Sequence, residues 1–140
     1  MRRSVRELIE CYDPDSQLAE ASTPPSAWYT DPRILELEQR TVFSRSWQVV
    51  CRATQIREPG QYITSEIAGE PILAIRGNDN VLRGFFNVCR HHAAAIMTNS
   101  EGKTENLRCP YHGWTYDLQG NLILTPEFAG VANFNRSANG

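Results

Sequence analysis

Four side chains that could bind a metal lie in two short segments of the sequence. Cys89 and His91 are two positions apart, Cys109 and His112 are three positions apart, and residues 92–108 separate the two segments. Each segment offers one thiolate and one imidazole, which are both good ligands for transition metals. Brought together, the segments would present two sulfurs and two nitrogens to one metal centre.

Two kinds of metal centre use this set of ligands. One is a tetrahedral Zn²⁺ site, and the other is a [2Fe–2S] cluster in which two histidines replace two cysteines on one iron. Zinc sites usually pair cysteine with cysteine and histidine with histidine, whereas here each segment gives one of each. The spacing therefore favours the two-iron cluster. A zinc-binding module, and a metal-free pair of loops with buried cysteines, stay open as alternatives.

Short β-strands are the elements that must position these residues. Strands are predicted over residues 47–52, 61–67, 71–76 and 81–88, and Tyr116 and residues 122–124 flank a further turn. Asn and Asp tolerate left-handed backbone, so residues 78–80 are a predicted hairpin turn. We expect a mainly β fold, a small antiparallel sandwich or barrel, with the four candidate ligands on loops.

A short helical leader is predicted before the strands. Residues 3–12 could form one or two helical turns, and Asp31 followed by Pro32 is typical of a helix start, here over residues 32–44. We therefore expect a leader and linker over residues 1–44 and the metal-binding domain over 45–140. Trp28 and Trp47 are predicted core residues, and residues 128–140 show no pattern that would close a domain.

Composition excludes several classes of function. Fourteen Lys and Arg against sixteen Asp and Glu give a net charge of −2, so we expect no nucleic-acid partner and no binding to membranes. The longest apolar runs fall far short of the roughly 18 residues of a membrane span. The N-terminus lacks the apolar stretch of a secretory signal. These features predict a cytoplasmic protein with reduced cysteines, available to a metal.

The sequence around both segments resembles a known family. The stretches NVCRH at 87–91 and CPYHGW at 109–114 resemble a Rieske [2Fe–2S] domain. More narrowly, they resemble the α subunit of Rieske non-haem iron oxygenases, a family that includes aromatic-ring-hydroxylating dioxygenases. Upstream, WYTDP at 28–32 and VFSRSW at 42–47 are similar to the N-terminal region of that subunit. The nearest likeness is to the choline monooxygenase-like group.

The resemblance implies a role for each candidate ligand. Cys89 and Cys109 would bind one iron of a Rieske [2Fe–2S] cluster, and His91 and His112 would bind the other. The cluster would carry one electron at a time, and a ferredoxin or a flavin reductase would be the electron donor.

The resemblance also covers the surroundings of the cluster. Trp114 and Tyr116 would pack around it and limit the access of water. Respiratory Rieske proteins add a disulfide between the two loops, but here His92 and Tyr111 stand in that neighbourhood. We therefore expect a potential at the low end of the Rieske range of about −150 to +300 mV, below zero. Many relatives have arginine at the position of His92. We expect His92 to be a surface histidine, and the alternative is that it is a spare metal ligand.

One feature of the oxygenase family is missing from the sequence. These oxygenases also bind a mononuclear Fe(II) through two histidines and a carboxylate. This chain has three histidines, and the cluster would use two of them. We therefore expect an oxidoreductase-family chain that transfers electrons without oxygenase turnover, with the catalytic domain absent, and a homotrimer only for a full-length relative. The alternative is a free-standing carrier of the Rieske ferredoxin type.

Overall fold

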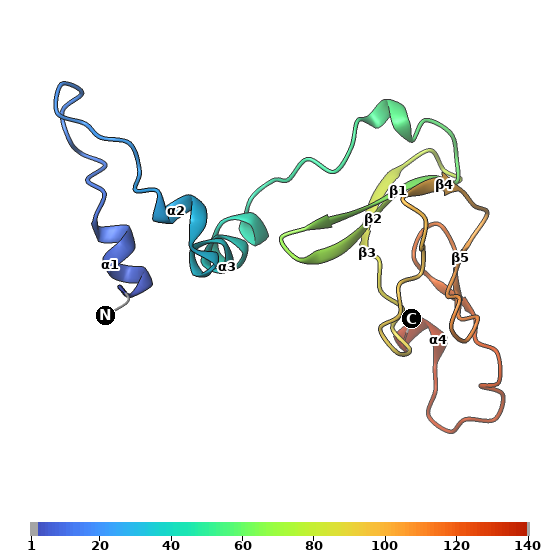
Figure 1. Ribbon diagram of the computed structural model, residues 1–140. Coiled ribbons are helices and arrows are strands. Elements are labelled where there is room, and N and C mark those ends of the chain that lie inside the picture. The colour runs from blue at the N-terminus through green and yellow to red at the C-terminus, as the bar shows by residue number, and fades with distance from the viewer. Residues whose placement is uncertain (1–2, 140) are drawn as a thin grey trace. The chain divides into compact units, whose positions relative to one another are not determined.

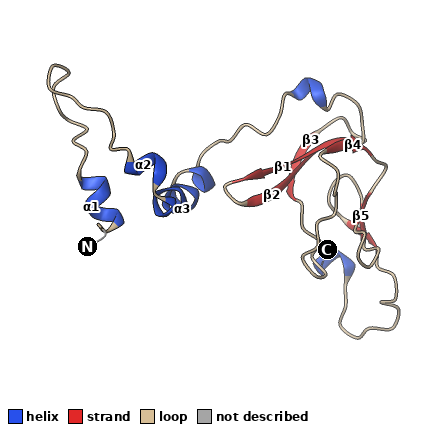
Figure 2. Cartoon of the chain, viewed as in Figure 1, coloured by secondary structure: helices blue, strands red, loops and turns tan. Residues whose placement is uncertain are grey.

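The computed structural model describes residues 3–139, and the chain divides into two compact units, Met1–Gln48 and Val49–Gly140. All strands of the described residues lie in the second unit, and the longest helix lies in the first (Figures 1 and 2). Within residues 3–139, no helix has the length and apolar character needed to cross a membrane.

The first unit is built from short helices. They are α1 (Val5–Glu10), α2 (Ala27–Thr30), α3 (Pro32–Thr41) and the 3₁₀ helix η1 (Phe43–Arg45). α3 begins as predicted, because the Asp31 carboxylate accepts a hydrogen bond from the backbone N–H of Arg33 at 3.1 Å. The predicted helix over 32–44 is shorter than expected and ends at Thr41, and the chain continues as a tighter 3₁₀ turn.

Two tryptophans that the sequence assigned to the core behave differently. Trp28 is half-buried, and its indole N–H donates to the carbonyl of Leu8 at 2.9 Å, which ties α2 to α1. Trp47 is fully exposed, so the prediction that it is a core residue is wrong.

The predicted strand over residues 47–52 is also wrong. No strand forms in this described segment, which leads into the 3₁₀ helix η2 (Ala53–Gln55), and Val49 is exposed like Trp47. The segment is rich in residues that favour strands, but such preferences depend on packing against a neighbouring strand. No strand pairs with it.

The second unit contains two antiparallel sheets. Its strands are β1 (Gln61–Ile67), β2 (Glu70–Arg76), β3 (Leu82–Phe86), β4 (Glu101–Lys103), β5 (Leu107–Arg108), β6 (Thr115–Tyr116) and β7 (Leu122–Leu124). The first sheet has the order β3-β2-β1-β4 and the second β5-β6-β7. The mainly β, antiparallel architecture expected from the sequence is confirmed. The sequence did not predict β4, because its three residues are all exposed and show no alternation of apolar and polar side chains.

Tight turns set the register of the first sheet. Ala68 and Gly69 connect β1 to β2, and both have positive φ, +55° and +84°, as a two-residue type I′ hairpin requires. The predicted turn at 78–80 connects β2 to β3. There, hydrogen bonds from Arg83 lower the pKa of Asp79 to about 2, so this ion pair holds the turn over most of the pH range.

One apolar core joins the two sheets to the cysteines. Its buried members are Tyr62, Leu73, Ile75, Cys89, Ile96, Leu107, Cys109, Trp114, Tyr116, Leu118 and Leu122. They come from both sheets and from the loops between them. The two candidate sulfur ligands are therefore held by the packing of the domain itself.

Truncation of this core should destabilise the second unit. Leu73 is completely buried, so Leu73→Ala should lower the free energy of unfolding by about 2–5 kcal/mol, through lost burial and the cavity that remains. Leu82→Ala is the matched control, because Leu82 is 43% exposed on an outer strand, and it should cost about 1 kcal/mol or less. Urea unfolding measures both, and equal losses would contradict the assignment of the core.

Candidate metal centre

Two loops from different sheets carry the four predicted ligands. The first loop follows β3 and contains Cys89 and His91, and the second follows β5 and contains Cys109 and His112. The strand before the second loop is anchored in the core by Leu107 of β5, which is only 2% exposed, and the partly buried Phe85 of β3 packs against the same core. The structure thus brings together the two segments that the sequence singled out.

Both loops close with the same pair of backbone hydrogen bonds. The N–H of Cys89 donates to the carbonyl of Ala94, and its carbonyl accepts from the N–H of Ala93, both at 2.8 Å. In the second loop, the N–H of Cys109 donates to the carbonyl of Trp114 at 2.8 Å, and its carbonyl accepts from Gly113 at 3.0 Å. The backbone therefore forms an equivalent hydrogen-bonded turn in both loops.

The sulfurs lie at the buried end of the centre. Cys89 and Cys109 are free thiols, 1% and 2% exposed. Tyr116 stands beside the first of them, with its hydroxyl oxygen 3.6 Å from the Cys89 sulfur, and accepts a hydrogen bond from the backbone N–H of Arg90 at 3.1 Å. Burial, followed by the hydrogen bond with Cys89, raises the pKa of Tyr116 to about 12, so the phenol stays protonated and can donate to the sulfur.

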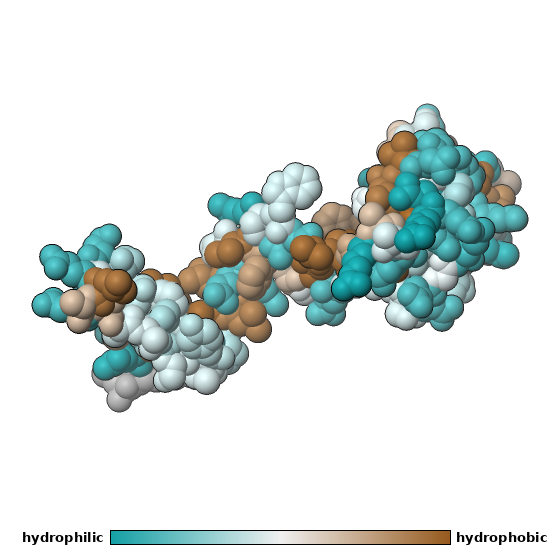
Figure 3. All heavy atoms as spheres, turned by 90° about the horizontal axis from the view of Figure 1, so that it is seen from above, coloured by the Kyte–Doolittle hydropathy of each residue, from teal (hydrophilic) through white to brown (hydrophobic). Residues whose placement is uncertain are grey.

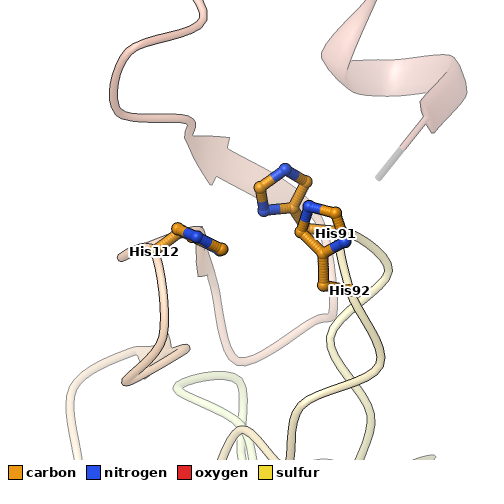
Figure 4. A group of neighbouring side chains, drawn as sticks. All are labelled: His91, His92 and His112. Carbon is orange, nitrogen blue, oxygen red and sulfur yellow. The ribbon is translucent and has the colours of Figure 1, made fainter.

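The imidazoles lie nearer the surface. His91 is half-buried and His112 is exposed, and their ring centroids are 4.8 Å apart. Figure 4 shows the two rings reaching toward each other from opposite loops. Burial lowers the pKa of His91, and the neighbouring imidazoles of His92 and His112 lower it further. The ring is therefore neutral at pH 7, the form that binds a metal.

One nitrogen of His91 points to metal binding. Its Nδ1 atom is buried and has no hydrogen-bond partner among the described residues. Such atoms are rare, because burying a polar group without a partner costs about 1–3 kcal/mol. A metal ion bound to Nδ1 would satisfy it.

A cleft of about 540 Å³ opens beside these groups and is lined by residues that include His91, Cys109, His112 and Phe128. The donor set of the two loops, two thiolates and two imidazoles, fits a two-iron cluster. It fits a single zinc ion less well. The imidazole nitrogens of His91, His92 and His112 all lie within 4.8 Å of one another, and this group of close donors contains neither sulfur. A tetrahedral ion would need both sulfurs and both nitrogens around one point.

Aromatic side chains cover the imidazole end. The Trp114 indole stacks on His91, with ring centroids 4.6 Å apart and planes 5° apart. Phe128 packs edge-on against both rings, and Phe134 packs against Trp114 and Phe128. These two phenylalanines come from the segment 128–140, in which the sequence showed no closing pattern. The sequence missed them because the segment as a whole shows neither a helical nor a strand pattern of apolar residues.

A buried amide holds the first loop to the rest of the fold. Asn87 is 5% exposed. Its side chain donates to the carbonyl of Met97 at 2.7 Å and accepts from the N–H of Met97 at 2.9 Å. These two hydrogen bonds fix both ends of the segment that contains Cys89 and His91. The only sign of this role in the sequence is weak, a polar residue at the end of an apolar strand.

The family model for the Rieske [2Fe-2S] domain matches residues 46–135. The chain belongs to the Rieske [2Fe–2S] domain family. A domain of this family carries a [2Fe–2S] cluster, in agreement with the donor set of the two loops.

Individual relatives are oxygenase subunits. The chain is 37% identical over 136 residues to "Choline monooxygenase, chloroplastic" of Arabidopsis thaliana, covering 97% of this chain and 32% of the plant protein. It is 42% identical over 117 residues to "Carnitine monooxygenase oxygenase subunit" of Escherichia coli K12, covering 83% of this chain and 31% of that protein. The chain thus spans about a third of the length of these curated relatives.

Solved structures agree with this placement. A quaternary ammonium Rieske monooxygenase in complex with L-carnitine matches with a TM-score of 0.81 at 35% identity, over 91% of this chain and 37% of that one. Naphthalene 1,2-dioxygenase from Rhodococcus sp. matches with a TM-score of 0.77 at 30% identity, over 83% of this chain and 27% of that one. The Rieske-type fold predicted from the sequence is confirmed.

Because the two loops close in the same way, substitutions at two equivalent small residues should have opposite effects on the free energy of unfolding. Ala93 and Gly113 occupy the same place in their loops with positive φ, +57° and +72°. Gly113→Ala should lower the free energy of unfolding by about 1–2 kcal/mol, because an alanine is strained there and its Cβ would lie 3.3 Å from Pro126. Ala93→Gly should be neutral or stabilising by up to about 1 kcal/mol. Urea unfolding of the metal-free protein tests both, and a destabilising Ala93→Gly would contradict the strain argument.

Proposed function

We propose that Cys89 and Cys109 bind one iron of the [2Fe–2S] cluster, that His91 and His112 bind the other, and that the chain transfers single electrons. The observation that carries this proposal is the pair of equivalent loops, which place two buried thiols at one end and two imidazoles at the other. The buried, unpartnered Nδ1 of His91 supports it.

The sulfur end and the imidazole end of the site would have different roles in electron transfer. When bound, the cluster takes up one electron and passes it on. Cys89 and Cys109 keep the sulfur end inside the core, away from water. His112 is exposed and His91 lies beside it, so the imidazole end is where an electron would enter or leave. Trp114 and Phe128 shield the His91 ring from water on that side.

We propose further that the chain acts as the N-terminal part of an oxygenase α subunit of the choline and carnitine monooxygenase type. The similarity to the plant choline monooxygenase covers 97% of the chain, so it includes the helical first unit, which an electron carrier does not need. On this proposal residues 1–44 are a leader and residues 45–140 the Rieske domain, in keeping with a family match that begins at residue 46. A free-standing ferredoxin-type carrier is less well supported for the same reason.

The partners follow from this role. A ferredoxin or flavin reductase would supply the electron, and in a full-length relative a mononuclear Fe(II) would receive it, with a homotrimer as the assembly. Mixing the purified chain with a reduced ferredoxin tests the donor step, because the visible absorption of the oxidised cluster should bleach. A cluster that dithionite reduces but that neither a ferredoxin nor a flavin reductase reduces would contradict the proposed donors.

Removal of a proposed ligand should abolish the cluster. Cys109→Ser and His112→Gln should each lose the visible absorption and the electron paramagnetic resonance signal of the reduced cluster, with iron falling from two per chain toward zero. Cys51→Ser is the matched control, since Cys51 lies outside both loops, and it should keep the full iron content. Cluster retention in both ligand variants would overturn the assignment.

The hydroxyl of Tyr116 should tune the potential. Its hydrogen bond to the Cys89 sulfur stabilises the reduced cluster, which carries more negative charge, so Tyr116→Phe should lower the midpoint potential. A hydrogen bond of about 0.5–1.5 kcal/mol corresponds to roughly 20–60 mV for one electron. A redox titration measures the shift. The wild-type midpoint should lie below zero, and an unchanged or higher value in the variant would contradict a donating hydroxyl.

A further inference from the structure

A third imidazole stands beside the two that the cluster would use. The ring centroid of His92 lies 4.0 Å from that of His91 and 5.3 Å from that of His112. One ligand nitrogen from each of the three lies within 4.8 Å of the other two. Figure 4 shows His91 and His92 side by side on one loop, with His112 facing them from the other. The cluster needs only two of these rings, so His92 is left over.

The equivalent turns of the two loops explain why His92 lies beside the other two imidazoles. Both loops close through the same two hydrogen bonds at their cysteines, and His92 and His112 each come three residues after their cysteine. The same position in each of the two turns therefore carries an imidazole. The two cysteines are buried, whereas His92 and His112 are exposed. An ion arriving from solution would meet the imidazoles before the thiols.

Three imidazoles at this spacing suit a transition-metal ion. Imidazole nitrogen is a good ligand for Zn²⁺, Cu²⁺ and Ni²⁺, and bonds of about 2.0–2.1 Å place the nitrogens about 3.3–3.5 Å apart around a tetrahedral ion. The three nitrogens lie within 4.8 Å of one another, so binding would require them to approach by up to about 1.5 Å. The buried Nδ1 of His91, the same atom that supports cluster binding, has no hydrogen-bond partner among the described residues, so it is available to an ion when no cluster is bound.

We propose that, before the cluster is inserted, His91, His92 and His112 form a site for a first-row divalent cation. The ion and the cluster then compete for His91 and His112, so occupation by the ion blocks cluster assembly. The competition rests on the proposed cluster ligands, whereas the ion site rests only on the three neighbouring imidazoles.

Titration of the cluster-free full chain with Co²⁺ tests the proposal, because cobalt reports its ligands by absorption. One Co²⁺ per chain should bind and give visible ligand-field bands without the near-ultraviolet band of a cobalt–thiolate bond. His92→Gln should weaken Co²⁺ binding at least about tenfold, since one of three ligands is lost. It should leave the cluster content of the iron-loaded protein unchanged. Cys51→Ser is the matched control and should bind Co²⁺ as the wild type does.

Three results would overturn the proposal. A cobalt–thiolate band would mean that the cysteines bind the ion, in a site of two cysteines and two histidines. Unchanged affinity in His92→Gln would mean that the third imidazole takes no part. Equal Co²⁺ binding before and after cluster loading would mean that the two do not compete. A chain that binds Co²⁺ through His92 yet accepts no cluster would instead refute the proposed function.

Discussion

The backbone hydrogen bonds of the two cysteines are the constraint on which the metal centre depends. Each cysteine both donates and accepts within its own loop, so Cys89 and Cys109 are fixed in the same conformation at the ends of strands from different sheets. This closure turns the sulfurs into the core and leaves His112 exposed at the surface. A change in either loop would therefore move a sulfur and an imidazole together.

The core and the centre are one packing unit. Cys89 and Cys109 belong to the same buried cluster as Leu73 and Trp114, so the packing that stabilises the fold also positions the sulfurs. The imidazole end depends on fewer contacts, mainly the stacking of Trp114 on His91. Figure 3 shows that apolar side chains also reach the surface of both units among polar ones. Trp47 and Val49 are both almost completely exposed.

The strands that the sequence predicted well are those that alternate and end at turn residues. Residues 61–67 were predicted to the residue as β1, and the strands predicted at 71–76 and 81–88 match β2 and β3 within a few residues. The failure at 47–52 has a physical cause, because a strand needs a partner and preference alone supplies none. β4 shows the reverse case, since pairing with β1 makes a strand of three exposed residues.

The sequence by itself singled out the four candidate metal ligands, because their types and spacing are local properties of two short segments. Tertiary structure alone decided that His91 is half-buried, that Trp114 stacks on it, that Phe128 covers both rings and that Phe134 packs on Trp114. It also brought His91 and His92 of one loop to His112 of the other. These features depend on contacts between residues far apart in the chain, and side-chain packing, which no local pattern encodes, sets them.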